Sequence, residues 1–483
     1  MPTSQLSSTS RVHRLIGAST TLAVGLSLTA CTVGPNYKPP PAPVPPAFQG
    51  TTTSEPPAGS ASIGAGDWWQ VFHDPELDAL EKQADAANTD IKIAITRVDQ
   101  AAATTAYAHS FLFPTITAQP TVDRTREAQN RPNNGATSGK AATYNDFQLP
   151  LVLNYEIDAW GRVRRTVEAA QATQQATVDD FRFVRLTTEA TVAIDFYQLR
   201  ENDQELRVLD KTIADLEQTL DLTTNLFTHG LGSELQVAQA KTLLDQTRAS
   251  KQTLLISRAQ SEHAIAVLLG RTAEGFSIPV QPDAPPPPVV PIGLPADLLK
   301  RRPDVLEADR NVAAATAQIG VAKAAYLPQL SLTGLVGYES SNASTLLNWQ
   351  NSIASLAASA VAPVFTAGRL HAGVQQARAA YQGSLLQFEK TVLTSYKEVE
   401  DQLSALQYLK SQSQLQSLAV ADATRSEQLA TQRFKAGLVS YLDVVTAQQE
   451  VLFNERTAAQ ISGQRLLDTV VLVKALGGGW TRS

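Results

Sequence analysis

The amino-acid sequence predicts an α+β membrane protein made of two similar halves, each with the order helix, strand, strand, helix, helix. Three observations predict this architecture: an internal repeat, long proline-free stretches with heptad spacing, and a strand with strict alternation of apolar and polar residues. Three copies are expected to combine their strands into a 12-stranded outer-membrane β-barrel that continues into a long periplasmic α-helical barrel.

The first 30 residues have the layout of an export signal. Arg11 and Arg14 form a positively charged start, and an apolar stretch of small and branched residues follows from Leu15 to Ala30. This stretch has 16 residues, fewer than the roughly 20 that a helix needs to span a bilayer. We therefore expect residues 1–30 to be a signal peptide that is removed.

Cys31 is the only cysteine in the chain, and it directly follows Leu28, Thr29 and Ala30. One branched apolar residue and two small ones before a cysteine match the lipobox of bacterial lipoproteins, in which the thiol receives a diacylglycerol. Two or three acyl chains at the new N-terminus give a durable anchor where one chain does not. The alternative is an ordinary cleavage site, but it leaves an exported cysteine without a disulfide partner. Thr32, in place of Asp, favours sorting to the outer membrane.

Proline-rich segments divide the rest of the chain. Residues 31–66 are rich in Pro, Ser, Thr and Gly, and are expected to be an extended, poorly ordered strap between the lipid and the fold. A first repeat is expected over 67–275, a Pro-rich linker over 276–295 and a second repeat over 296–483. The charge is mildly acidic, with 40 Lys and Arg against 46 Asp and Glu and no basic block, which argues against nucleic acid as a partner.

The internal repeat is seen most clearly in two segments, FTHGLGSELQVAQA at 227–240 and FKAGLVSYLDVVTA at 434–447. Seven residues are identical at an offset of 207, and the same offset places Gly161-Arg162 on Gly368-Arg369. This period is too long for a solenoid unit, so it favours duplication of a whole structural half.

In the first half a helix is predicted over 76–112, ending before Pro114, and strands are predicted over 115–127 and 143–158. The corresponding strands of the second half are predicted near 329–339 and 350–365. The strand at 143–158 alternates most clearly, with Phe147, Leu149, Leu151, Leu153, Tyr155 and Ile157 on one face. Such a strand fits an outer-membrane barrel or half of a soluble sandwich, and the lipidation signal favours the membrane.

Long helices are predicted from heptad spacing after each strand pair. Residues 162–228 contain no proline, and a helix of this length extends about 100 Å, threefold the thickness of a bilayer core, so it belongs in the periplasm. The chain is expected to reverse at Gly230 and Gly437, in left-handed conformation, and to return as helices of about 40 residues. The heptad positions are Val178, Val192, Leu199, Leu206, Ile213 and Leu220, then Leu385, Val392, Val399 and Leu406.

Four strands in one chain cannot close a barrel, since the smallest barrels have about eight. An open sheet in lipid leaves unpaired edges that cost several kcal/mol per group, so the barrel must be shared between chains. A dimer would give eight strands and a filled interior, whereas a trimer would give twelve and room for a lumen. An assembled tube favours three copies.

The chain resembles the TolC-like outer membrane factors, in the NodT-type branch of efflux lipoproteins, over residues 31–480. The resemblance rests on CTVGPNYKPP from Cys31, GLPADLLKRRPDVLEADRNVAAA at 293–315, the duplicated FxxGLxSxLxV turns and KALGGGW at 474–480. It implies a homotrimer that serves as the outer-membrane exit duct of a tripartite efflux pump and passively conducts small molecules to the exterior. The implied partners are outer-membrane lipid, a periplasmic adaptor protein and an inner-membrane transporter of the resistance-nodulation-division or major facilitator type. The exit duct of a protein or peptide secretion system is the alternative, and a non-transporting structural lipoprotein is a second one.

The resemblance also assigns roles to residues at the two turns. The positions at which adaptors would dock are Gly230, Leu231, Ser233, Leu235, Gly437, Leu438, Ser440 and Leu442. A purely structural role is compatible with docking, because Gly and Ser can cap the turns while the leucines pack between hairpins. Relatives commonly carry an Asp where this chain has Thr446, and Asp443 lies about one helical turn earlier. A periplasmic gate ring of Asp443, paired with Lys435 or Arg433, is thus a hypothesis beside the simpler role of a solvated charge.

Nothing in the sequence indicates an enzyme. The six histidines are scattered without metal-ligand spacing, and the sequence contains no HExxH, GxSxG or P-loop pattern. The glycines of GGGW lack the Lys and Ser/Thr of a phosphate site and are expected to form a flexible helix end. No catalytic residue, metal or cofactor is predicted.

Overall fold

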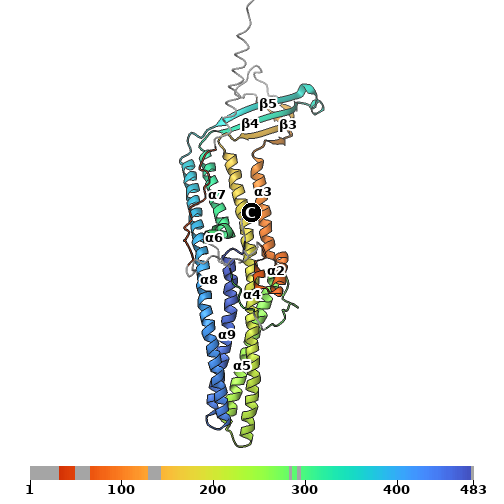
Figure 1. Ribbon diagram of the computed structural model, residues 1–483. Helices are drawn as coiled ribbons and strands as arrows, with labels where there is room; N and C mark the ends of the chain where they lie inside the picture. The colour runs from red at the N-terminus through yellow and green to blue at the C-terminus, as the bar shows by residue number, and fades with distance from the viewer. Residues whose placement is uncertain (1–31, 49–65, 129–142, 282–284, 291–294, 480–483) are drawn as a thin grey trace, which may run out of the picture. The chain divides into compact units, whose positions relative to one another are not determined.

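The computed structural model describes residues 32–48, 66–128, 143–281, 285–290 and 295–479 (Figure 1). The predicted signal peptide and Cys31 lie outside these residues. The chain forms two compact units, and each unit combines segments from both halves of the sequence. Of the described residues, unit 1 comprises 32–40, 99–128, 143–175 and 309–386. Unit 2 comprises 41–48, 66–98, 176–281, 285–290, 295–308 and 387–479.

Unit 1 contains one antiparallel sheet (Figure 1). Strands β3, β4 and β5 are neighbours in this order, and β1 and β2 both pair with the free side of β3. The sheet therefore has four strand positions, as predicted, because β1 and β2 share one of them. The bounds are β1 Thr115–Ala118, β2 Thr121–Arg126, β3 Thr143–Ile157, β4 Gln329–Ser340 and β5 Ser352–Val361.

Two strand predictions need correction. The predicted single strand 115–127 is interrupted at Gln119-Pro120, because Pro120 has no N–H to donate to the ladder. The last strand is shorter than the predicted 350–365 and ends at Val361, before Pro363. The strands predicted over 143–158 and 329–339 are confirmed to within one residue. Two short 3₁₀ turns, η2 Ala343–Thr345 and η3 Trp349–Asn351, connect β4 to β5.

The two long helices are confirmed with equal lengths of 67 residues, and the two returning helices have 35 residues each, slightly fewer than predicted. None of the described helices is long and apolar enough to cross a membrane. The helices are η1 Trp68–Phe72, α2 Pro75–Ala87, α3 Thr89–Ser110, α4 Arg162–Thr228, α5 Glu234–Leu268, α6 Pro295–Arg301, α7 Pro303–Ala324, α8 Arg369–Lys435 and α9 Tyr441–Ala475.

The prediction of one helix over 76–112 is wrong, because Asn88 separates α2 from α3. The Asn88 side chain accepts hydrogen bonds from the backbone N–H groups of Asp90 (2.8 Å) and Ile91 (3.1 Å), which caps the start of α3. Its Nδ2 donates to the carbonyl of Leu268 at the end of α5 (2.9 Å). The break is therefore a cap that also ties two helix ends of unit 2 together.

Half of the predicted heptad positions lie in the interior of unit 2, and the others, Val178, Ile213, Leu220, Leu385 and Leu406, are only half-buried. Val192 and Leu199 on α4, and Val392 and Val399 on α8, are completely buried. Aromatic side chains fill the space beside them, and Tyr197 lies with its ring centroid 5.2 Å from that of Phe72 on η1. Heptad spacing therefore identified positions that the fold buries.

Candidate functional site

The turn between α4 and α5 has the backbone geometry that its glycine predicts. Gly230 has φ of 73°, and its N–H donates to the carbonyl of Phe227 (2.9 Å). The N–H of Leu231 donates to the carbonyl of Leu226 (2.8 Å), which completes a Schellman motif. The predicted left-handed helix end is confirmed at this turn.

The turn between α8 and α9 has the same geometry. Gly437 also has φ of 73°, and its N–H donates to the carbonyl of Phe434 (2.8 Å). The N–H of Leu438 donates to the carbonyl of Arg433 (2.9 Å). The two turns, which have similar sequences, therefore also have the same backbone conformation.

A serine is the N-cap of each returning helix, and the side chain of the residue three positions later accepts a hydrogen bond from it. The backbone N–H of Ser233 donates to Oε1 of Gln236 (3.1 Å). In the second turn, Oδ2 of Asp443 accepts from the backbone N–H (3.0 Å) and the hydroxyl (2.7 Å) of Ser440. Both arrangements are capping boxes, and they differ in charge because Gln236 is neutral and Asp443 is acidic.

The four predicted leucines of the turns are exposed in one chain. Leu231 is 78% exposed and Leu438 is 69% exposed, and Leu235 and Leu442 are also largely exposed. They do not pack between the two hairpins of this chain. Exposed leucines at a helix turn are typical of a surface that another molecule or another copy covers.

Other residues form the contact between the two hairpins. Leu216, Leu243 and Leu244 of the first hairpin pack with Tyr441 and Val444 of the second. The Tyr441 side chain is 1% exposed, and its hydroxyl has no hydrogen-bond partner among the residues that the structure describes. Burial raises the pKa of Tyr441 to about 12.

Tyr441 was not among the predicted site residues. The sequence repeat identifies positions that are identical in both halves. Tyr441 is not one of them, because Glu234 occupies the equivalent position in the first half. The sequence signal for Tyr441 is an aromatic residue directly after the capping serine, at a position where the other repeat has a charged residue.

The three gate candidates do not form a cluster within one chain. Asp443 is engaged by Ser440, and no ion pair in the described part of the chain joins it to Arg433 or Lys435. The hydroxyl of Thr446 donates to the carbonyl of Leu442 on its own helix (2.9 Å). Any ring formed by these residues therefore requires several copies of the chain.

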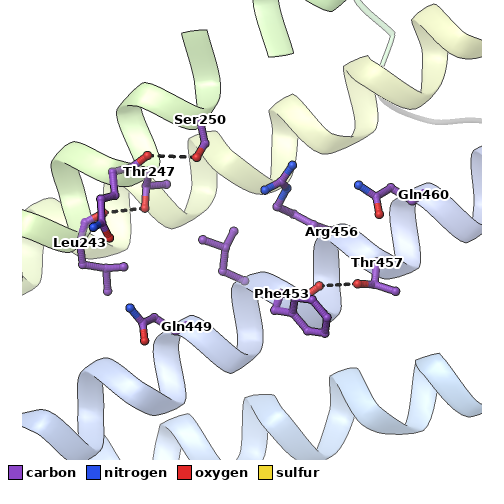
Figure 2. A pocket seen from close by; sticks show the side chains of 10 residues that line it. Leu243, Thr247, Ser250, Gln449, Phe453, Arg456, Thr457 and Gln460 are labelled. Atoms are coloured by element: carbon purple, nitrogen blue, oxygen red, sulfur yellow. Dashed lines mark hydrogen bonds between the residues drawn. The ribbon is translucent and has the colours of Figure 1, made fainter. Parts of the chain in front are cut away.

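A groove of about 330 Å³ lies between α5 and α9 (Figure 2). Leu243, Leu452 and Phe453 provide apolar surface, and the hydroxyls of Thr247, Ser250 and Thr457 donate to carbonyls of their own helices. Arg456 and Gln460 donate to the carboxylate of Glu205 on α4, at 2.9 and 3.0 Å. The groove is thus open and lined by both apolar and polar side chains, and Arg456 is the charged residue of its lining.

The RRPDV and LGGGW motifs, which are distant in sequence, meet within unit 2. Arg302 Nη1 donates to the carbonyl of Ala475 (3.1 Å) and to Glu398 (2.7 Å), while its Nη2 donates to Asp304 (2.7 Å). Gly477 has φ of 91°, and a Cβ added there would lie 3.1 Å from the backbone of Arg301. The prediction of a flexible end is wrong for the glycines, because Gly477 and Gly478 are buried; Trp480 lies outside the described residues.

The start of the strap is extended, as predicted, but it is hydrogen-bonded to unit 1. The buried Arg165 on α4 donates from Nη2 to Oδ1 of Asn36 (2.6 Å) and from Nε to the carbonyl of Val33 (3.3 Å). The N–H of Val33 donates to the carbonyl of Trp160 (3.0 Å). The prediction of a poorly ordered strap therefore does not hold for these residues.

Two glycines allow the strap to lie this close. Gly34 rests against Gly320 on α7, where an added Cβ would lie 2.8 Å from the carbonyl oxygen of Val33. Further along, the Tyr37 hydroxyl donates to Asp309, and the Arg310 guanidinium carbon lies 5.1 Å from the centroid of the Tyr37 ring. The strap thus binds helices from both repeats.

The described residues contain no group of three or more His, Cys, Asp or Glu side chains that could hold a metal ion. The family of the chain follows from comparison with known proteins. A profile of outer membrane efflux proteins matches residues 80–271 and 294–478. The chain belongs to this family.

Relatives are similar along their whole length. The solvent efflux pump outer membrane protein SrpC of Pseudomonas putida is 31% identical over 474 residues, which cover 95% of this chain and 97% of SrpC. The cation efflux system protein CusC of Escherichia coli is 28% identical over 458 residues, with 95% and 97% covered.

Solved structures of the same family have the same fold. The outer-membrane channel OprN has a TM-score of 0.87 and 28% identity, covering 93% of this chain and 100% of OprN. A structure of CusC has a TM-score of 0.82 and 26% identity, covering 92% and 100%. The chain is therefore an outer-membrane channel component of an efflux pump from a Gram-negative bacterium, in a family of channels rather than enzymes. As such it forms trimers and works with an adaptor and an inner-membrane transporter.

Proposed function

We propose that three copies of this chain join their sheets into a 12-stranded barrel in the outer membrane, and that the long helices form the periplasmic part of a passive duct for small molecules. The observation that carries this proposal is the segregation of the sheet into one apolar and one polar face. The alternative function is the exit duct of a protein or peptide secretion system, and photo-cross-linking of the turns to their partner distinguishes the two.

The register of the sheet places apolar residues of all strands on the same face. Leu149 lies opposite Tyr338, Leu151 lies opposite Val336, and Ile157 lies opposite Leu330. Several of these side chains are exposed in one chain, so water would contact a continuous apolar surface. Lipid is the medium that favours such a surface. The apolar face also includes Ile116, Val122, Phe147, Leu153, Tyr155, Leu332, Ala354, Leu356, Ala358 and Ala360.

The opposite face is predominantly polar. Ser331 lies opposite Ser359, and their hydroxyls are hydrogen-bonded at 2.7 Å. A polar face on the inside of a closed barrel suits an aqueous lumen. Further residues of this face are Thr115, Thr117, Asp123, Asp146, Gln148, Asn154, Glu156, Gln329, Thr333 and Glu339.

The edges of the sheet support assembly from several copies. Among the described residues of one chain, β5 pairs only with β4, and β1 and β2 pair only with β3, so both edges have backbone groups without a partner there. Each such group costs several kcal/mol in lipid. Three sheets of four strand positions close these edges and leave an interior wider than that of an eight-stranded barrel.

The N-terminal strap supports a lipid anchor at Cys31. A Cβ added to Gly161 would lie 2.7 Å from the Thr32 side chain, so Thr32 is next to the junction of β3 and α4. A lipid on the preceding residue would start at the edge of the expected barrel, where acyl chains can enter the membrane directly.

The turns support docking of a periplasmic adaptor, which would link the duct to a transporter of the resistance-nodulation-division or major facilitator type. Their exposed leucines stand on two rigid Schellman turns with capped helices behind them. The docking positions are Gly230, Leu231, Ser233, Leu235, Gly437, Leu438, Ser440 and Leu442. A gate at the same end would use Asp443, with Lys435 or Arg433 from a neighbouring copy.

Cross-linking between the sheet edges tests the barrel. Cysteines at Thr117 on β1 and at Ala357 or Ser359 on β5 should give covalent trimers in outer membranes under oxidising conditions. The pair Val152 with Ala357 is the matched control, because β3 is an inner strand and should not contact a neighbouring copy. Dimers alone, or no cross-linked product from any edge pair, would reject the trimeric barrel.

A photo-reactive residue at Leu231 or Leu438 tests the partner in cells, with the exposed Asp245 further along α5 as the control position. Capture of a periplasmic adaptor, identified with its transporter by mass spectrometry, is the expected result. Capture of an exporter of peptides or proteins would favour the secretion alternative. Capture of this chain alone would show that the leucines pack between copies.

A further inference from the structure

Glu81 lies in the middle of the buried face of α2, which also contains Leu77, Leu80 and Ala84. Its side chain is completely buried, and neither carboxylate oxygen has a hydrogen-bond partner within the part of the chain that the structure describes. Glutamate is almost never found in this condition unless it is paired, because burial of an unpaired negative charge is very costly. The uncharged form of the carboxyl group avoids this cost.

The charged groups that face Glu81 increase the cost of ionisation. Its own helix contributes Asp78 and Asp85, and α4 contributes Glu189. Arg185 is the cation of this cluster, but its Nε already contacts Asp85 (2.7 Å) and Glu189 (2.9 Å). Asp85 and Glu189 therefore share one guanidinium, whereas Glu81 and Asp78 have no ion-pair partner among the described residues. Of these two, Glu81 is completely buried and Asp78 is half-buried.

The remaining elements around the cluster bring hydrogen-bond donors to Glu189 and none to Glu81. Trp68 on η1 donates from Nε1 to Oε2 of Glu189 (2.9 Å). The turn after α9 approaches the same place with Gly478, which lies against Leu186 and Trp68 and carries no charge. Burial raises the pKa of Glu189 to about 7, although Arg185 and the Trp68 donor favour its ionised form. Glu81 has no such donor among the described residues.

We propose that Glu81 holds a proton at neutral pH, and that the contact between α2 and α4 is a latch that weakens as the pH rises, because opening the latch releases this proton. Ionisation of Glu81 places a second negative charge beside Glu189, in a site that only Arg185 balances. The two helices must then separate far enough for water to reach the carboxylate. The cluster lies wholly within unit 2, so the latch does not depend on the proposed barrel.

The direction of the pH effect follows from the protonation states. The pKa of Glu81 is raised well above 4.5, first by burial and then by Glu189, Asp85 and Asp78. Above pH 4.5 the opened state releases the proton while the closed state keeps it. The closed state therefore loses up to tenfold in its equilibrium constant per pH unit, until the raised pKa is passed.

Hydrogen exchange on the full-length protein in detergent tests the latch. After correction for the intrinsic exchange rate, protection of the α2 amides should fall by up to tenfold per unit from pH 6 to pH 9. Glu81→Gln keeps the size of the side chain and should remove this slope above pH 7, where Glu189, with its pKa raised to about 7, no longer contributes. Asp90→Asn, an exposed acid at the start of α3, is the matched control and should keep it. A wild-type slope in Glu81→Gln, or loss of α2 protection in this variant at every pH, would overturn the proposal.

A spectroscopic measurement does not depend on how the variant folds. Infrared spectra of protein labelled with ¹³C-glutamate should contain the C=O stretch of a protonated carboxyl group at pH 7. Part of this band should persist above pH 8, because Glu189 and Glu201, whose pKa values burial raises to about 7, have then ionised. A spectrum at pH 7 with ionised glutamate only would also overturn the proposal.

Discussion

Arg302 Nη1 donates a hydrogen bond to the main-chain carbonyl of Ala475, 173 residues later in the chain. The same guanidinium binds Asp304 and Glu398, and its side chain is 6% exposed. One side chain therefore joins the start of α7, the middle of α8 and the end of α9. This contact explains physically why two short motifs far apart in the sequence occur together.

Replacement of Arg302 by Met should destabilise unit 2 by about 3–5 kcal/mol, because Asp304 and Glu398 lose the cation that balances them. Urea denaturation followed by circular dichroism measures the loss. Arg301→Met at the neighbouring position is the control, with an expected change below about 1 kcal/mol. Equal losses in both variants would contradict the role of the guanidinium.

Tyr441 is expected to contribute through its ring and not through its hydroxyl. Tyr441→Phe removes a buried hydroxyl that has no hydrogen-bond partner among the described residues, so its stability should equal or exceed that of the wild type. Tyr441→Ala leaves a cavity between the hairpins and should cost about 3–5 kcal/mol. Thermal unfolding of both variants distinguishes these effects. A strongly destabilised Phe variant would indicate that the hydroxyl has a partner in the assembled protein.

Asp443 has a capping role in one chain and a proposed gating role in the trimer, and one substitution separates them. Asp443→Asn keeps an acceptor for Ser440 and removes the charge. If a ring of Asp443 closes the duct, this variant should raise the conductance in planar bilayers and the leakage of drugs into cells. Gln236→Asn at the equivalent position is the control. Unchanged conductance in Asp443→Asn and in Asp443→Ala would exclude the gate.

Asp195 on α4 should make the free energy of unfolding of unit 2 depend on pH, separately from the effect of Glu81. Burial raises the pKa of Asp195 from 3.8 to about 6. The folded state therefore keeps a proton that the unfolded state releases, and stability should fall as the pH rises from about 4 to about 6. We expect a loss of about 1 kcal/mol after allowance for solvent screening at this partly buried site.

Asp195→Asn should reduce the slope of this part of the stability profile, while the contribution of Glu81 above pH 4.5 remains. Substitution of the exposed Asp221 by Asn should leave the profile unchanged. Chemical denaturation at several pH values provides the comparison. A profile that is identical in wild type and Asp195→Asn would contradict the assignment.

Gly320 should determine whether the strap can bind to unit 1. Gly320→Val would push the carbonyl of Val33 away and break the contacts of Arg165 to the strap. Limited proteolysis should then cut residues 32–40 at least tenfold faster than in the wild type. The helical Gly373, which has free space around it, is the matched control. Equal cleavage rates would show that the strap is held by other contacts.

The long helices could be predicted because heptad spacing reports directly on burial, and Val192, Leu199, Val392 and Val399 are indeed buried. The alternation in β3 likewise predicted which side chains share a face. The break at Asn88 was missed because the apolar periodicity continues through it, and only the capping hydrogen bonds to Asp90 and Ile91 reveal a new helix.

Contacts between irregular segments could not be predicted. The strap binds through carbonyls of its backbone and through the absence of side chains at Gly34 and Gly320, and neither leaves a periodic pattern. Glu81 was missed because PELDALEKQADAA has the composition of an exposed helix, and its burial depends on which face α4 covers. The turns were found from identical residues, so Tyr441, which differs between the repeats, was overlooked.

The two capping boxes have a consequence for the symmetry of the trimer. Three chains have six turns with nearly identical backbones, but their carboxylates lie at different positions: Asp443 is the third residue of α9 and bonds its capping serine, whereas the acidic residue of α5 is the first, Glu234, and the neutral Gln236 bonds the serine. In a trimer whose six turns alternate around the three-fold axis, the shape of the ring of turns would repeat after each sixth of a full rotation about that axis. The electric field of the ring repeats only after each third. A partner that senses shape can bind in six orientations, and one that senses charge is restricted to three.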